Sequence, residues 1–256
     1  MGIKEKDELT NQVELKKVTL TKKLLAIIPE DERVLFFLLG HFSNEIVILH
    51  KLLIYSLAKP ESNDVHEKEA RTSQSLFIAR LYIGKLFEGW QILNKSYFNK
   101  LSKEFDSKLS KQGKTALENL KRYFGKRTIV EKVRNTFSFH YDSEEVKKQY
   151  QRFDADKELT LYIADTANSF YHMSDEIINR AIFELIGEST AQKSLECLFG
   201  EVKEVGQWFI EFTGHCIVAI LDKYFKNGFD KLQWEVITIN NPPKIDEISI
   251  PFFVKK

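Results

Sequence analysis

The chain has 256 residues, of which 43% are hydrophobic and 12% aromatic, enough for the core of one large domain or two small ones. Its 38 basic and 37 acidic residues leave a formal net charge of +1, which excludes a protein that coats nucleic acid through its overall charge. With only 5 Pro and 11 Gly, the composition favours long helices. We predict a mainly α-helical chain that forms a single domain over residues 1–256.

Apolar residues recur at helical spacing along most of the chain, and capping or breaking residues divide them into segments. A charged leader ends near residue 19 and is followed by a short helix that Pro29 ends or kinks. The main predicted helices cover residues 34–58, 66–98, 101–109, 115–124, 127–139, 143–153, 168–186 and 189–225. Connections this short favour an antiparallel helical bundle.

Three short segments have the composition of strands. Residues 159–163, with the sequence LTLYI, are the best candidate in the middle of the chain. Residues 234–239 alternate between polar and apolar side chains, and residues 248–250 are a candidate for a short edge strand beyond Pro242 and Pro243. We therefore expect a small C-terminal β appendage on the helical bundle.

The sequence also bears on the compartment of the protein. Cys197 and Cys216 are the only cysteines and have no CxxC spacing, so neither a zinc site nor a redox dithiol is indicated. The N-terminus is charged and has no apolar signal core. The most apolar window, residues 34–58, is interrupted by Glu45 and Lys51 and fits a buried helix better than a membrane span. We expect a cytoplasmic protein with no membrane segment, metal or cofactor.

The run VRNTFSFHYD, residues 133–142, gathers groups suited to phosphate chemistry. Arg134 carries a permanent charge on a planar fork that fits phosphate oxygens. His140 exchanges a proton near neutral pH, and Asn135 can orient a hydroxyl or a phosphate by hydrogen bonding. RNA cleavage without a metal needs a group that takes the 2′-hydroxyl proton and a group that stabilises charge on the phosphate. The run is the candidate catalytic site.

Helix geometry constrains this site. Six steps of roughly 100° place Arg134 and His140 about 120° apart on an ideal helix, so they do not share a face. They converge only if the helix ends or loosens near Phe139, or if two subunits meet at a two-fold axis. A structural alternative has His140 capping the helix C-terminus while Arg134 pairs with Glu131 or a later acidic residue.

Basic residues precede the run and form a second candidate feature. The group is offset only by Glu131 and could hold an RNA backbone through its phosphates. Its members, the predicted RNA-binding residues, are Lys121, Arg122, Lys126, Arg127 and Lys132.

The pattern Arg134-Asn135-x4-His140 resembles the signature of the HEPN superfamily, which is Arg, a polar residue and then His after four to six positions. The resemblance implies an all-α bundle, usually a homodimer, with metal-independent RNA endonuclease activity that leaves a 2′,3′-cyclic phosphate. It implies that Arg134 and His140 are catalytic and that Asn135 assists. Such proteins occur as toxins, some with an antitoxin partner, and as phage-defence effectors. The HEPN-like core would cover residues 31–190, with residues 191–256 as an extension.

Other functions fit the same sequence. A catalytically inactive helical bundle would use the basic residues to bind RNA, or would bind a protein partner. A small-molecule sensor would use a pocket among the many aromatic residues. His41 and His50 share a helix face with Glu45 nearby, but this group is weak as a metal site, and core or interface positions suit these histidines better.

Overall fold

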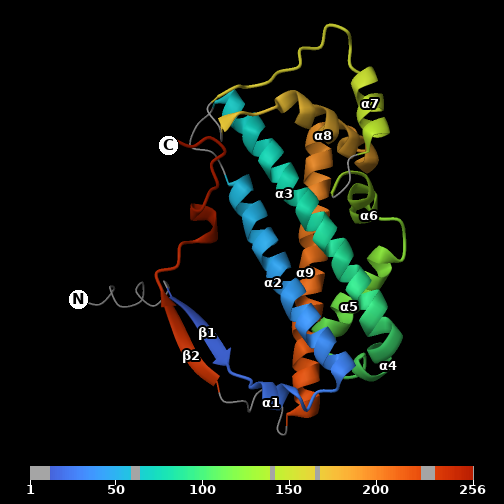
Figure 1. Cartoon of the computed structure of the whole chain (residues 1–256), viewed down its shortest axis with the longest axis vertical. Helices are drawn as coiled ribbons and strands as arrows, with labels where there is room; N and C mark the ends of the chain where they lie inside the picture. Colours follow the sequence, from blue (N-terminus) through green and yellow to red (C-terminus); the bar gives the residue numbers. More distant parts are fainter. Residues whose placement is uncertain (1–11, 59–63, 139–141, 165–167, 226–233, 256) are drawn as a thin grey trace, which may run out of the picture.

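The computed structural model describes residues 12–58, 64–138, 142–164, 168–225 and 234–255, and shows a bundle of long helices beside a small antiparallel sheet (Figure 1). The helices are α1 (Lys22–Leu25), α2 (Glu30–Leu57), α3 (Val65–Ile92), α4 (Ser102–Phe105), α5 (Lys111–Phe124), α6 (Ile129–Val133), α7 (Ser143–Gln151), α8 (His172–Ile186) and α9 (Ala191–Tyr224). Two π-helical segments, η2 (Leu93–Leu101) and η3 (Arg134–Ser138), continue α3 and α6, and η6 (Ile245–Glu247) is a 3₁₀ turn. The mainly helical prediction is confirmed.

Local sequence explains where the long helices begin and end. Asp64 caps α3, because its side chain accepts hydrogen bonds from the backbone N–H groups of His66 and Glu67, at 2.8 and 3.1 Å. Ser110 and Thr190 cap α5 and α9 in the same way. Gly187 ends α8 with a φ of 81°, a conformation that glycine adopts without strain. The predicted helices at residues 34–58, 115–124 and 143–153 therefore have close counterparts in α2, α5 and α7.

The core lies where α2, α3, α5 and α9 pack along one another. Phe42 of α2 meets Phe209 of α9 edge-to-face, with 5.1 Å between ring centroids. Gly89 of α3 leaves room for the Phe42 ring, since an added Cβ would lie 1.9 Å from its Cζ atom. Glycine at this position therefore lets two long helices approach closely.

The C-terminal third supplies a central part of this bundle. α9 is the longest helix and packs on α2, α3, α5 and α8, with side chains such as Phe209 and Phe212 fully buried. Residues 191–225, which the HEPN resemblance left unexplained, thus complete the core that the earlier helices begin.

One helix among the described residues, α2, is long and apolar enough to cross a membrane by length and composition alone. Here it packs against α3 and α9 and buries Leu35, Leu39 and Phe42. Glu45, which interrupts its apolar surface, forms an ion pair with Lys85 of α3 at 2.7 Å. This packing is compatible with a water-soluble protein.

The sheet differs from the prediction in its composition. β1 (Gln12–Val18) pairs antiparallel with β2 (Trp234–Asn240), so the N-terminal leader supplies one strand of what we expected to be a purely C-terminal appendage. The predicted strand at 159–163 is wrong, since only Tyr162 forms an isolated bridge, with Phe170. The predicted edge strand at 248–250 is also absent from the described residues, where Ile250 instead donates its backbone N–H to the carbonyl of Tyr55.

Candidate functional site

The candidate catalytic run begins where a short helix changes its hydrogen bonding. Thr128 caps α6 by accepting the N–H of Glu131 at 3.0 Å, and Val133 is buried at the other end of the helix. From Arg134 to Ser138 the backbone is π-helical. Thr136 donates its hydroxyl to the carbonyl of Lys132 at 2.9 Å, a side-chain bond of the kind that bends helices. The helix is thus distorted over residues 134–138, which is one of the two conditions under which Arg134 and His140 could converge.

Arg134 is held by three contacts, two of them with α3 and one with Asn135. Its guanidinium lies over the ring of Phe87, 4.9 Å from the centroid. One terminal nitrogen donates to Oδ1 of Asn135 at 3.1 Å, and the other lies 3.5 Å from Oε1 of Glu88. Its Nε atom is buried without a hydrogen-bond partner among the described residues. The side chain is 29% exposed, so the fork is fixed in orientation while part of it still faces solvent.

The ionic partner of Arg134 differs from the structural alternative. We expected Glu131 or a later acidic residue, whereas the partner is Glu88, which precedes Arg134 in the chain and comes from α3. At 3.5 Å this contact is at the long end of hydrogen-bonding distances, and the Glu88 side chain is 49% exposed. A loose pair of this kind is weak and salt-sensitive, so an anion near the fork would compete with Glu88 for it.

The other two members of the motif have different outcomes. Asn135 is exposed, and its amide oxygen accepts a hydrogen bond from Arg134, so these two predicted residues are in contact. His140 lies outside the described residues, so its distance from Arg134 stays a prediction. The structure resumes at Asp142, which caps α7 by accepting the N–H groups of Glu144 and Glu145 at 3.1 Å.

The predicted RNA-binding residues differ in their surroundings. Lys121 pairs with Asp106 at 3.3 Å and lies over the Phe98 ring, so its charge is already partly matched. Lys132 is half-buried in α6. The remaining three are exposed around the α5–α6 connection and form no ion pair within the described residues. They are Arg122, Lys126 and Arg127.

Metal ligands do not gather in the described part of the chain, where no group of three His, Cys, Asp or Glu side chains lies close enough to hold an ion. His41 and Glu45 are 3.7 Å apart, but Lys85 is the closer partner of that carboxylate. Burial first, and the charge of Lys203 second, lower the pKa of His50. The lowered pKa favours the neutral imidazole of His50, which lines a pocket between α2 and α9.

No family model, no curated protein and no solved structure matches this chain. Sequence reasoning missed Phe87 and Glu88, which orient the Arg134 fork. The signal that could have found them is weak: an acidic residue follows an aromatic one on the otherwise apolar stripe of the second long helix.

Proposed function

We propose that this chain is a metal-independent RNA endonuclease of the HEPN type, suited to the role of a toxin or phage-defence effector. The observation that carries the proposal is the setting of Arg134. Its fork is oriented by Phe87, Asn135 and Glu88, remains partly exposed, and lies six residues before His140 at a point where the helix is distorted. Distorted π-helical turns occur frequently at functional sites.

The proposed chemistry assigns one role to each side chain. Arg134 binds the scissile phosphate and stabilises the negative charge that builds on its oxygens. His140 takes the proton from the 2′-hydroxyl, which attacks the adjacent phosphorus. The bond from phosphorus to the 5′-oxygen breaks, this oxygen leaves as a hydroxyl after taking a proton from the protonated His140 or from water, and a 2′,3′-cyclic phosphate remains. Asn135 keeps the Arg134 fork in plane, as it does through the 3.1 Å bond. When phosphate replaces Glu88, that carboxylate can turn to solvent because it is half-exposed.

The test is RNA cleavage in the presence of EDTA. A structured RNA is incubated with the wild-type protein and with the variants His140→Ala and Arg134→Ala, and the product ends are examined for the cyclic phosphate. We expect a loss of about 100- to 10,000-fold for His140→Ala, the usual contribution of general acid–base catalysis. For Arg134→Ala we expect about 100- to 1,000-fold, the usual cost of removing one charge-stabilising donor.

Matched controls separate the site from the fold. His41→Ala removes a histidine that is 73% exposed, so it should cleave RNA like the wild type. Arg134→Lys keeps the charge but loses the planar fork, so most of the activity should still be lost. Equal cleavage by wild type and His140→Ala, or no cleavage by either, contradicts the nuclease proposal.

A second candidate function is RNA binding without cleavage. The three basic residues at the α5–α6 connection that form no ion pair with any described residue favour it. When a protein binds RNA through phosphates, the logarithm of the association constant falls linearly with the logarithm of the salt concentration. On single strands the slope is about 0.7 for each phosphate contact. Replacing Arg122, Lys126 and Arg127 by Ala should therefore reduce the slope by about 2. Lys121→Ala should change it little, because Asp106 already pairs with that charge.

The homodimer part of the proposal is supported by the outer face of α2. Val34, Phe37, Leu38 and Ile48 recur at helical spacing and are 47%, 50%, 38% and 56% exposed. A two-fold dimer would bury such a face against its own copy, with about 800 Å² for each subunit. Arg134 lies against α3 and not on this face. Sedimentation equilibrium of wild type and Phe37→Glu tests this, and a monomeric wild type contradicts it.

A further inference from the structure

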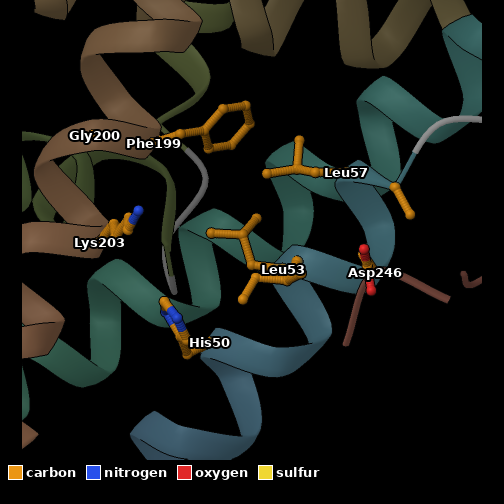
Figure 2. A pocket seen from close by; sticks show the side chains of 9 residues that line it. His50, Leu53, Leu57, Phe199, Gly200, Lys203 and Asp246 are labelled. Carbon is orange, nitrogen blue, oxygen red and sulfur yellow. The ribbon is translucent and has the colours of Figure 1, made fainter. Parts of the chain in front are cut away.

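A hollow of about 630 Å³ opens between α2, α9 and the C-terminal segment (Figure 2). Its size is in the range of sites for small molecules, about 300–1,000 Å³. The wall is largely apolar and is formed by Leu53, Ile54, Leu57 and Phe199. Burying an apolar ligand here would remove both the ligand and these side chains from water.

The C-terminal segment closes one side of the hollow and is attached at two places. Ile250 donates its N–H to the carbonyl of Tyr55 in α2 at 3.3 Å. Further along, the side chain of Asn168 donates to the carbonyl of Val254 at 2.8 Å and accepts its N–H at 2.9 Å. Asp246, in the η6 turn before these attachments, lines the hollow. The wall is therefore held by hydrogen bonds to the bundle and is part of the folded chain.

Charge is distributed unevenly around the hollow. Lys203 of α9 and His50 of α2 lie toward one end, and Asp246 lies toward the other (Figure 2). The ammonium group of Lys203 forms no ion pair within the described residues. An anionic group at this end of the hollow would give Lys203 a partner.

Gly200 contributes open space to the same wall. A Cβ added at this position would meet no atom within 4 Å, so the position faces the hollow rather than a packed neighbour. Glycine in a helix interior costs about 1 kcal/mol relative to alanine. The position therefore offers a way to fill the hollow without disturbing the core.

We propose that this hollow binds an amphiphilic carboxylate, with its apolar body against Leu53, Leu57 and Phe199 and its carboxylate on Lys203. The proposal is independent of RNA cleavage, because it uses α2 and α9 and none of the residues of the Arg134 site. It provides a site for the small-molecule sensing that the aromatic content of the sequence suggests.

The first experiment compares three probes with the same alkyl chain by calorimetry at neutral pH: decanoate, decanol and decyltrimethylammonium, below their micelle concentrations. We expect decanoate to bind about fivefold more tightly than decanol, as suits one exposed charge pair, and the cationic probe to bind most weakly. Octanoate should bind more weakly than decanoate by up to about fourfold for each methylene that the hollow buries. Lys203→Gln should remove the preference for decanoate over decanol.

The second experiment fills the hollow. Gly200→Leu should weaken decanoate binding by about tenfold or more, because the new side chain occupies the space of the ligand. Gly214→Leu is the matched control: it lies on the same helix, an added Cβ there also meets nothing within 4 Å, and it is outside the hollow. It should bind decanoate like the wild type. Absence of binding by all three probes, tighter binding of the cationic probe, or unchanged binding in Gly200→Leu overturns the proposal. Neither binding assay contains RNA, so failure of the ligand proposal can be told apart from failure of the nuclease proposal.

Discussion

The substitution Gly206→Ala should destabilise the protein even though alanine is the better helix former. Gly206 lies in α9 where Tyr82 of α3 packs against it, and an added Cβ would be 2.0 Å from the tyrosine Oη and 2.9 Å from its Cζ. Unstrained carbon contacts lie at about 3.5–4.0 Å. Tyr82 is fully buried, so its ring has no room to move aside. Overpacking costs about 1–3 kcal/mol and the helix gains about 1 kcal/mol, so we expect a loss of up to about 2 kcal/mol in the free energy of unfolding.

Two other glycines of α9 serve as controls in urea denaturation followed by circular dichroism. Gly200→Ala and Gly214→Ala meet no neighbour and should each stabilise the protein by up to about 1 kcal/mol. Tyr82→Phe removes the atom nearest to position 206, so Gly206→Ala should cost less in that background. If Gly206→Ala stabilises the protein as much as the two controls, α3 and α9 do not approach each other as closely as the structure has them.

Two further predictions concern titratable groups. Hydrogen bonds from Arg152 and then Gln149 lower the pKa of Glu184 to about 2, so this carboxylate stabilises the fold above its unfolded pKa of about 4.3 and loses the effect as the pH falls toward 2. Because Glu184 is 41% exposed, Glu184→Gln should lower the free energy of unfolding by at most about 1 kcal/mol at neutral pH and by nothing near pH 2, as measured by urea titration. A difference between wild type and variant that stays constant with pH would contradict this. Burial raises the pKa of Cys216 to about 12 and also raises the pKa of Cys197. Iodoacetamide should therefore modify the native protein slowly, and the half-buried Cys197 should react before the buried Cys216. Mass spectrometry that finds Cys216 modified as fast as Cys197 would contradict this order.

The helices were predictable because their signals are local. Apolar spacing, an acidic or hydroxyl cap and a glycine stop all lie within the segment that they organise, as Asp64 shows for α3 and Gly187 for α8. Strand pairing depends on a partner far away in the sequence. β1 has four polar residues among its seven, and its pairing with β2 joins Gln12 to Asn240 across almost the whole chain. The charged leader could not reveal that partner.

The mistaken strand at 159–163 shows how composition can mislead. Of its β-forming residues, Tyr162 contacts α3, whereas Leu161 and Ile163 are 41% and 83% exposed. Tyr162 donates to a carboxylate oxygen of Glu69 at 3.0 Å, contacts His66 Nδ1 at 2.8 Å and stacks on Phe170 with centroids 5.9 Å apart. Aromatic and β-branched residues suit any half-buried surface, so their presence alone does not distinguish a strand from a packed loop.

The candidate site was predictable only for neighbours in the sequence. Arg134 and Asn135 are adjacent in the sequence and share a hydrogen bond, and their roles in RNA cleavage stay a prediction. Phe87 and Glu88 reach Arg134 from α3, across a sequence separation of 46 residues in the case of Glu88. No periodicity indicates such a contact, because it follows from how α6 packs on α3.

The exposed sheet also bears on the ligand hollow. Val13 pairs with Ile239 and Leu15 with Ile237 across the two strands. Even so, Val13, Leu15 and Ile239 remain 43–48% exposed. A lone two-stranded ribbon is marginally stable in water, so β1 and β2 contribute little to holding the chain that follows them. The bonds of Ile250 and Val254 to the bundle must therefore keep the C-terminal wall in place. Fraying of the ribbon should thus leave decanoate binding intact, which ties the hollow to the bundle and not to the sheet.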